Sequence, residues 1–306
     1  MFQPSPGKKL NKGRVDQRWV PIRSARPTTT VWAQGLTLGP KVSVEWAFRE
    51  FEPHPALAPF VDRLWVRSGT PDTDAGPERI LPDGCIDLLV DVTRGWNAAV
   101  VGTMTRATLF EPSEPTRIVA VRFRPGGARP FLNVAAHEIT DLIVEGRDLG
   151  LCWLAPPPAT GETRLVAAVR ALERMLLDRL PAIAAPDPVI MRAVAALFAP
   201  APPSIATLAR ELGWSRQHLG RALRFHVGLS PVQLARVARL QRAVDLLQRG
   251  QTTSLAEAAL RLGYFDQAHM TRDIRELAGV TPRVAAASAG SIFPIRSLLR
   301  AHDLPR

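Results

Sequence analysis

Apolar and polar residues alternate with a period of two in the first half of the chain, as at Ile86, Leu88 and Val90. This alternation is typical of a strand with one buried face. Similar short apolar runs, bounded by turn residues, occur at 79–81, 99–102 and 118–123. The pattern predicts a mainly β region over residues 45–155, with a short helix near Phe131.

The pattern becomes helical after the prolines at 156–158. Apolar residues then recur at spacings of four, three, four and four, at Leu165, Val169, Leu172, Leu176 and Leu180. Such spacings place side chains on one face of a helix. We interpret this face as buried core, and a dimerisation surface is the alternative. Pro181 ends the helix, and Asp187 is expected to cap the next one.

The carboxy-terminal region contains an internal repeat at a shift of 50 residues. The matching pairs are Ser204/Ser254, Ile205/Leu255, Leu208/Ala258, Ala209/Ala259, Leu212/Leu262 and Gly213/Gly263. After one inserted residue the match continues at Leu219/Met270, Arg221/Arg272, Arg224/Arg275, Gly228/Gly279 and Pro231/Pro282. A duplicated structural unit is the simplest explanation, because chance rarely preserves cap, core and breaker positions together.

Each repeat carries the signals of a helix, a sharp turn and a second helix. The opening serine is a helix N-cap, and the closing glycine favours the left-handed backbone that ends a helix. The second helices are expected to begin after Ser215 and Asp266 and to bury Leu219 with Leu223, and Met270 with Ile274. A helix, a tight turn and a basic second helix form the geometry that lays a helix into the major groove of DNA.

A long connecting helix is predicted between the repeats. Ser230, Pro231 and Gln233 form an N-terminal capping signature, and an apolar stripe continues from Leu234 to Gly250. Such a helix would hold the two second helices at a fixed separation. That separation must be about 34 Å if both enter successive major grooves on one face of the duplex.

Basic residues are concentrated towards both ends of the chain. Residues 1–44 contain eight basic and one acidic residue, residues 45–203 contain 16 and 20, and residues 204–306 contain 15 and 7. Basic surface attracts a polyanion at long range and releases counterions on contact. All lysines of the sequence lie in the first segment, at Lys8, Lys9, Lys12 and Lys41. We expect residues 1–44 to be a disordered basic extension, with a DNA-contacting arm as the alternative.

The two cysteines, Cys85 and Cys152, are too few for a disulfide framework and lack zinc-site spacing. A thiol nucleophile at Cys85 would need a nearby histidine, but His54 and His137 are distant in the sequence. We therefore interpret Cys85 as a buried structural residue and expect no catalytic residue, no metal and no cofactor. A catalytic or thiol-sensing β domain that carries a DNA-binding tail is the alternative.

The sequence has no stretch of 18 uncharged apolar residues and no apolar amino-terminal leader. Membrane helices and secretory signals need such segments. A cytoplasmic protein without membrane contact is therefore expected.

The carboxy-terminal region resembles the AraC/XylS family of transcription regulators over residues 187–288. Its most specific part is LAEAALRLGYFDQAHMTR at 255–272, followed by GVTP at 279–282. Two positions depart from the family pattern: Ala285-Ala286 stand where Tyr-Arg is usual, and Ile274 stands where an aromatic residue is usual. The resemblance implies a DNA-binding domain of two helix-turn-helix units joined by a long helix.

The amino-terminal region resembles the uncharacterised domain that precedes this module in a subset of the family. The matching residues are PDGCIDL at 82–88, Val101-Gly102 and RFRPGG at 122–127. The resemblance implies a regulatory or oligomerising role.

The expected fold class is therefore α+β and multidomain. A β-rich regulatory domain at 45–155, built as a cupin-like barrel or a sandwich, precedes a linker with an amphipathic helix at 156–186. An all-α double helix-turn-helix domain follows at 187–288, and a tail occupies 289–306. The expected partners are double-stranded DNA, an unidentified small-molecule effector, a second copy in a homodimer, and RNA polymerase.

Residues near the start of each second helix are the candidates for DNA contact, because that end reads base edges while surrounding basic residues bind phosphates. The base-reading candidates are Arg216, Gln217 and Arg221 in the first unit, and Gln267, His269, Thr271 and Arg272 in the second. The phosphate-binding candidates are Arg224 and Arg275.

Two alternatives involve no DNA. Some of these arginines would only solvate a helix face or pair with Glu211, Glu257 or Asp273. Arg221 and Arg272 would otherwise form internal salt bridges between the units.

Overall fold

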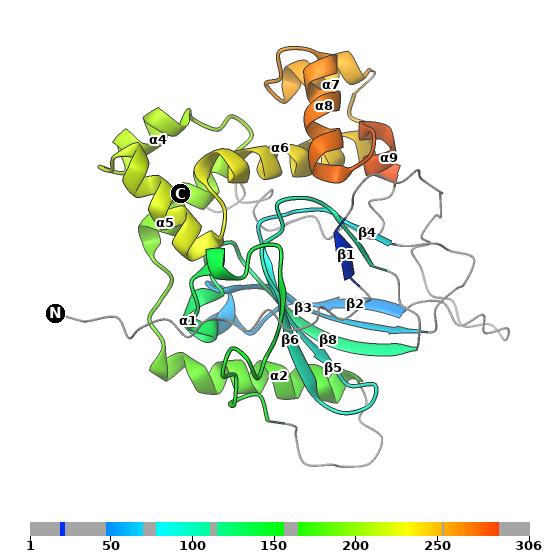
Figure 1. Ribbon diagram of the computed structural model, residues 1–306, viewed down its shortest axis with the longest axis vertical. Coiled ribbons are helices and arrows are strands. Elements are labelled where there is room, and N and C mark those ends of the chain that lie inside the picture. The colour runs from blue at the N-terminus through cyan, green and yellow to red at the C-terminus, as the bar shows by residue number, and fades with distance from the viewer. Residues whose placement is uncertain are drawn as a thin grey trace, which may run out of the picture.

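A mainly β region and an all-helical region lie side by side in the protein (Figure 1). The structure is a computed structural model and describes residues 19–21, 47–69, 78–110, 115–155, 165–252 and 254–287. The predicted disorder of residues 1–44 falls outside these ranges except at Trp19–Pro21, which form strand β1. The predicted tail at 289–306 also lies outside them.

The β region is built on a six-stranded antiparallel sheet with the order β2-β3-β8-β5-β6-β9. Its strands are Ala47–Phe51 (β2), Val61–Gly69 (β3), Thr116–Phe123 (β8), Ile86–Asp91 (β5), Asn97–Val101 (β6) and Ile143–Glu145 (β9). A smaller antiparallel sheet has the order β1-β7-β4, with Thr108–Phe110 as β7 and Glu78–Ile80 as β4. The predicted strands are confirmed as β4, β5, β6 and β8, whereas the sequence predicted no separate strand at β1, β2, β3, β7 or β9.

One face of the large sheet is covered by helix α2 (Leu165–Arg179). The buried side of α2 carries Ala168, Val169, Leu172 and Leu176, which join one apolar cluster with residues of β3, β5 and β8. Strands β2 and β9 lie at the two edges of the large sheet, so its described strands do not close on themselves.

Short helical turns complete the β region. They are η1 (Pro55–Leu57), α1 (Arg129–Leu132), η2 (Ala136–Glu138) and η3 (Leu180–Ala182). The glycine at 127 has a packing reason, since a Cβ there would lie 2.3 Å from the carbonyl oxygen of Phe60.

The helical region runs from α3 to α9. Its helices are Pro188–Phe198 (α3), Ile205–Glu211 (α4), Arg216–Val227 (α5), Pro231–Gln248 (α6), Leu255–Arg261 (α7), Gln267–Ala278 (α8) and Pro282–Ala287 (α9). The pairs α4–α5 and α7–α8 flank the long helix α6 (Figure 1). These pairs correspond to the two sequence repeats.

Every N-cap predicted in this region is confirmed. Asp187, Ser204, Ser215, Ser254 and Asp266 each accept a backbone N–H in the first turn of the helix that follows. Ser230 and Gln233 form the reciprocal capping box of α6. Ala285 and Ile274, where the sequence departs from the family pattern, are fully buried in the cluster between α6, α8 and α9.

Truncation of Leu172 distinguishes a core role of α2 from a dimerisation role. Because its side chain is fully buried, Leu172→Ala is expected to lower the free energy of unfolding by about 2–5 kcal/mol. Val166→Ala, on the exposed side of the same helix, is the matched control and should leave it nearly unchanged. Urea unfolding followed by tryptophan fluorescence measures both, and equal small effects would contradict the core role.

Candidate nucleic-acid interface

Helix α5 presents a basic side to solvent and an apolar side to the interior. Its inward residues Leu219 and Leu223 are fully buried, and the Ser215 hydroxyl accepts the N–H of His218 at 3.1 Å to fix the helix start. All four predicted DNA contacts of the first unit are exposed: Arg216, Gln217, Arg221 and Arg224. Folding therefore leaves them accessible to a ligand outside the protein.

Helix α8 repeats this arrangement. Met270 and Ile274 are fully buried, and Asp266 accepts the N–H of His269 at 2.6 Å. The predicted contacts Gln267, His269, Arg272 and Arg275 are exposed, whereas Thr271 is half-buried. Gln267, Thr271, Arg272 and Arg275, together with Ala268, line a shallow hollow on the outer side of the helix.

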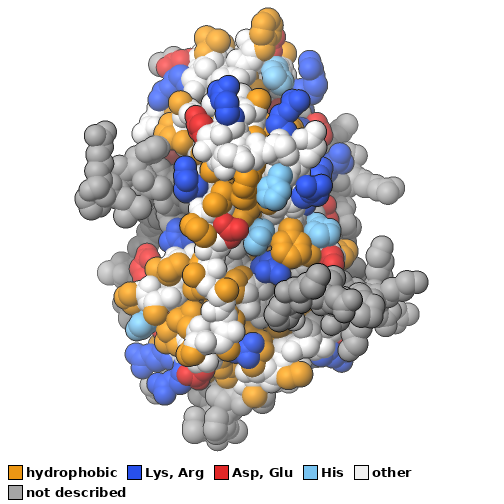
Figure 2. Space-filling view, turned by 90° about the vertical axis from the view of Figure 1, so that its left-hand side faces the viewer, with side chains coloured by type: hydrophobic (Ala, Val, Ile, Leu, Met, Phe, Trp, Pro, Cys, Tyr) orange, Lys and Arg blue, Asp and Glu red, His pale blue; other side chains and the backbone are white. Residues whose placement is uncertain are grey.

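The candidate arginines of α5 and α8 are not consumed by ion pairs within the described residues. Asp273 pairs with Arg236 and Glu257 pairs with Arg261 instead, and Arg221 and Arg272 form no bridge between the units among the described pairs. Figure 2 shows the side of the molecule that carries α4 and α5, with arginines and histidines recurring over the helical part of its surface. Unpaired exposed arginines retain their charge for phosphates and base edges.

His269 is the most constrained of the predicted contacts. Its Nδ1 accepts the N–H of Phe265 at 3.5 Å, and its ring meets that of Tyr264 edge-on at 5.2 Å. The neighbouring Phe265 is 87% exposed just before α8. Sequence reasoning assigned Phe265 no role, yet an exposed ring at this end of the helix suits apolar contact with a thymine methyl group.

A buried polar network fixes α8 on α6. The carboxylate of Asp273 accepts the hydroxyl of Tyr264 at 2.9 Å and the guanidinium of Arg236 at 2.6 Å. Burial, together with the negative charge of Asp273, raises the pKa of Tyr264. A neutral hydroxyl and a paired carboxylate therefore hold the second unit in place, and sequence periodicity gave no sign of this network.

The β region supplies hydrogen-bond donors to the carboxy-terminal end of α5. The hydroxyl of Thr103 donates to the carbonyl of Val227 at 2.6 Å, and the hydroxyl of Thr140 donates to that of Gly228 at 3.1 Å. The last carbonyls of a helix have no partner within the helix, so a buried end needs donors from elsewhere. Gly228 has φ of +92°, and a Cβ there would lie 2.6 Å from Thr140 Oγ1.

The carbonyls at the carboxy-terminal end of α8 also accept hydrogen bonds from the β region. The guanidinium of Arg79 donates to the carbonyl of Ala278 at 3.0 Å, and the N–H of Ala107 donates to that of Leu277 at 2.7 Å. Burial lowers the pKa of Arg79, while the negative end of the helix dipole favours its charged form. The β region thus contacts the ends of both candidate DNA-reading helices.

The loop at 82–85 docks against the middle of the helical region. The Nε2 of Gln241 on α6 donates to the carbonyl of Pro82 at 2.7 Å. Gly84 has φ of +85°, and a Cβ there would lie 3.1 Å from Leu234 of α6. Cys85 is buried in the same apolar cluster as α3, α4, α5 and α6. The PDGC motif, which resemblance linked only to an uncharacterised domain, therefore forms an interdomain contact.

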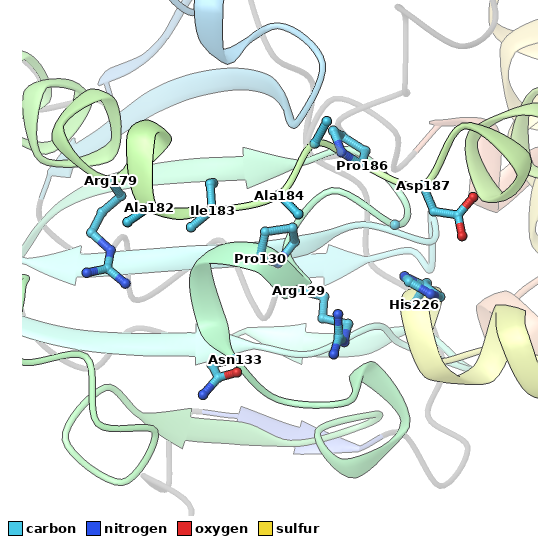
Figure 3. A pocket seen from close by; sticks show the side chains of 12 residues that line it. Arg129, Pro130, Asn133, Arg179, Ala182, Ile183, Ala184, Pro186, Asp187 and His226 are labelled. Carbon is cyan, nitrogen blue, oxygen red and sulfur yellow. The ribbon is translucent and has the colours of Figure 1, made fainter. Parts of the chain in front are cut away.

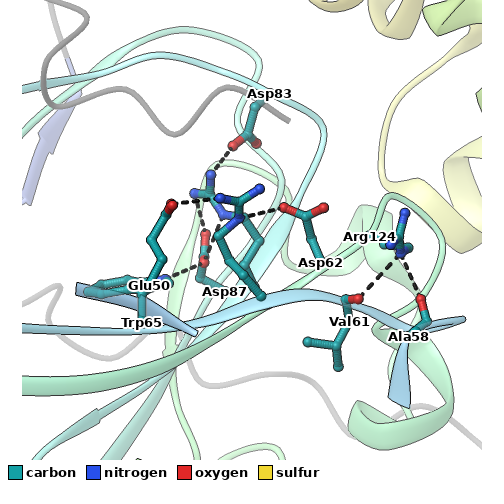
Figure 4. Close-up of polar contacts among 10 residues, drawn as sticks. Glu50, Ala58, Val61, Asp62, Trp65, Asp83, Asp87 and Arg124 are labelled. Atoms are coloured by element: carbon teal, nitrogen blue, oxygen red, sulfur yellow. Dashed lines mark hydrogen bonds and ion pairs between the residues drawn. The ribbon is translucent and has the colours of Figure 1, made fainter. Parts of the chain in front are cut away.

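An ionic cluster beneath this loop holds it in position (Figure 4). The guanidinium of Arg122 pairs with Asp83 at 2.9 Å and with Asp87 at 3.0 Å, and the indole of Trp65 donates to Asp87 at 3.2 Å. Burial raises the pKa of Asp83 to about 6, and the charge of Arg122 opposes that rise. The carboxylate of Asp87 therefore anchors hydrogen bonds from side chains of β3 and β8.

The thiol of Cys85 lies beside this cluster and is shielded from solvent, with 3% of the residue exposed. Burial and the negative charge of Asp83 raise the pKa of the thiol well above its usual range. A reactive thiol needs exposure and a lowered pKa, so this environment favours the structural interpretation of Cys85.

Comparison with known families agrees with this geometry. Residues 208–287 match the family described as a helix-turn-helix domain, and residues 49–145 match a domain of unknown function, DUF6597. Residues 208–287 therefore form a helix-turn-helix domain of the AraC type, the DNA-binding domain of a transcription regulator. The match to this domain begins within α4 and runs to the end of α9, while the other match spans most of the large sheet.

Solved structures that match the chain include ToxT from Vibrio cholerae. One ToxT structure is 9% identical, covers 81% of this chain and 99% of its own, and has a TM-score of 0.37. A ToxT structure with bound unsaturated fatty acid is 10% identical, covers 67% and 87%, and has a TM-score of 0.36. A likeness of this size carries no inference about ligands. No curated protein matches the sequence.

Two kinds of feature are absent from the described residues. Their helices include none with the length and apolar character needed to cross a membrane. Those residues also contain no group of three or more histidine, cysteine or acidic side chains placed to hold a metal ion.

Replacement of Arg122 tests the role of the ionic cluster. Arg122→Met leaves two buried carboxylates without their counter-ion and should lower the free energy of unfolding by about 3–5 kcal/mol. The loss should be larger at pH 8 than at pH 5, because protonation of Asp83, whose pKa is already raised, relieves the uncompensated charge.

Arg147→Met is the matched control. Arg147 pairs with Glu145 at the surface, with side chains 79% and 55% exposed, so its loss should have little effect. Chemical unfolding at both pH values measures the two variants. A pH-independent loss for Arg122→Met would contradict the burial of an ionised Asp83.

Proposed function

We propose that the two helix pairs are helix-turn-helix units that read adjacent major grooves of one DNA site, with α5 and α8 as the reading helices. The observation that carries this proposal is the repetition, on both helices, of a capped start and an exposed basic side. Helix α6, with its 18 residues, is about 27 Å long and joins the units without a break. This length is comparable with the ~34 Å that separates successive major grooves.

Within each unit the exposed residues divide by their place on the helix. Arg216, Gln217 and Arg221 contact base edges, and Arg224, one turn later, contacts phosphate. In the second unit Gln267, His269, Thr271 and Arg272 contact base edges, and Arg275 contacts phosphate. Arginine and glutamine suit this task because both form paired hydrogen bonds with purine edges.

The β region acts in this proposal as the gate. Its contacts with the ends of α5 and α8 leave all the predicted DNA contacts except Thr271 exposed. Docking of the β region on the helices therefore leaves the reading surface uncovered. Its effect on DNA binding comes from fixing the orientation of both helix pairs. The docked arrangement is the DNA-binding form, and a small effector that alters docking alters affinity. Homodimer formation and contact with RNA polymerase belong to the same proposal.

We further propose that the chain is not an enzyme. The alternative, a catalytic or thiol-sensing β domain, would depend on Cys85. The burial of this residue and its raised pKa disfavour thiolate chemistry.

Two arginines of the first unit separate base reading from phosphate binding. Arg221→Ala should weaken binding to the specific operator by about 1–3 kcal/mol and relax sequence preference at one position. Arg224→Ala should weaken binding to all sequences and flatten the dependence of affinity on salt by about one unit of slope. Fluorescence anisotropy on operator and random duplexes at several salt concentrations measures both.

Arg249→Ala is the control, because Arg249 is exposed, lies outside both proposed reading helices and pairs with Asp245. It should change neither specificity nor the salt slope. Equal losses of Arg221→Ala on operator and random DNA would contradict base reading by α5.

Thr103→Val tests the gate, because it preserves shape and removes the donor to the carbonyl of Val227. A buried carbonyl without a donor costs about 1–3 kcal/mol, so docking should weaken. Affinity for the complete operator should fall, whereas affinity for a single half-site should not change. Thr105→Val, which removes a hydrogen bond to Asp141 within the β region, is the control. An equal fall for both DNA lengths would refute orientation as the mechanism.

A further inference from the structure

A hollow of about 460 Å³ lies where the chain crosses from the β region to the helical region (Figure 3). Its walls come from three places: α1 with the residue that ends it, the crossing segment between α2 and α3, and the last turn of α5. The volume falls within the range of small-molecule sites. A molecule bound there would touch both regions and the first reading helix at once.

The polar groups of this hollow are mostly donors or cations. Arg129 and Asn133 project from the α1 side, Arg179 comes from the end of α2, and His226 comes from α5 (Figure 3). Asp187 is the carboxylate of the lining, and its Oδ1 already accepts the N–H groups of Val189 and Ile190 at the start of α3. The lining therefore has spare positive charge and spare donors.

Neither arginine has an acidic partner among the described residues. The Nε of Arg179 is buried without any hydrogen-bond partner. The guanidinium of Arg129 lies 4.2 Å from the centre of the Phe225 ring, which positions it without neutralising it. Buried donors without acceptors are costly in a folded protein, and an oxyanion would satisfy them in the paired geometry that guanidinium groups favour.

The remaining lining is apolar and comes from Pro130, Ile183 and Pro186, with three alanines between them. An inorganic ion would leave these side chains without contacts, whereas an organic body would cover them. Burial and the positive charge of Arg129 lower the pKa of His226, which leaves a neutral ring facing the hollow at neutral pH.

We propose that this hollow is the effector site, and that it binds a small organic oxyanion, a carboxylate or a phosphate ester, through Arg129 and Arg179. This inference rests on the proposed gate, and it names both the location and the chemical class of the effector. A bound ligand would contact the crossing segment, α1 and His226 together. His226 lies two residues before Gly228, whose carbonyl accepts the hydroxyl of Thr140. The ligand therefore acts on the same helix end that docking fixes.

The test uses the full-length chain and four probes. Cyclohexanecarboxylate, cyclohexyl phosphate and the uncharged cyclohexanecarboxamide share a cyclohexyl ring, and inorganic phosphate supplies the charge without the ring. One of the two organic oxyanions should bind saturably in calorimetry and raise the unfolding midpoint, and the stronger of the two identifies the headgroup. The amide should not bind. Binding of inorganic phosphate as tightly as either organic probe would overturn the organic class, and absence of binding by both organic oxyanions would overturn the site.

Arg129→Gln and Arg179→Gln should each weaken binding of the active probe at least tenfold. Arg170→Gln, on the exposed side of α2, is the matched control and should bind normally. The unfolding midpoint without ligand shows whether each variant is folded. If Arg129→Gln does not fold, Arg179→Gln and Asn133→Ala decide the question, and unchanged affinity in both would overturn the assignment.

Operator binding with and without the probe tests the effector role. The active probe should change operator affinity at least threefold in the wild type and should have no effect in Arg179→Gln. Binding of the probe without any change in operator affinity would overturn regulation through this site. Such a result would leave the DNA-reading proposal intact, because that proposal is measured separately by Arg221→Ala.

Discussion

The carboxy-terminal ends of helices α5 and α8 impose the constraint on which the rest of this structure depends. A helix cannot satisfy its own last carbonyls, and the ends of α5 and α8 both lie against the β region. That region provides two threonine hydroxyls to the end of α5, and an arginine side chain and a backbone N–H to the end of α8. The same contacts that complete the helices also join the two halves of the protein.

The PDGC motif has a role in this junction that follows from its chemistry. The backbone of the loop approaches α6 closely, which requires a glycine at the point of contact. Two aspartates turn inward and share Arg122, so the loop is held from below by charge and from above by apolar packing. A buried ion pair of this kind contributes little net stability but penalises any arrangement that separates its members. It therefore specifies one position of the loop.

The junction leaves most of the candidate DNA-binding surface of α5 and α8 exposed. The candidate arginines of α5 and α8 are exposed, and Asp273 is bound by Tyr264 and Arg236 instead. In the proposed function, this division lets one helix serve two purposes: its outer side would read DNA, and its end would respond to the β region. A ligand in the hollow beside His226 would act on the second purpose without competing for the first.

Signals between neighbouring residues were enough to predict the local structure of the carboxy-terminal region. Caps, helix spacings and the repeat predicted α4 to α8, the buried leucines and the exposed arginines, because these signals act between residues a few positions apart. Long-range packing set the face of the sheet that α2 covers, the carbonyls that Thr103 and Arg79 satisfy, and the place where Arg129, Arg179 and His226 meet. These contacts join residues far apart in the chain, such as Arg79 and Ala278. No periodicity specifies such pairs, since they arise only when two separately formed surfaces pack together.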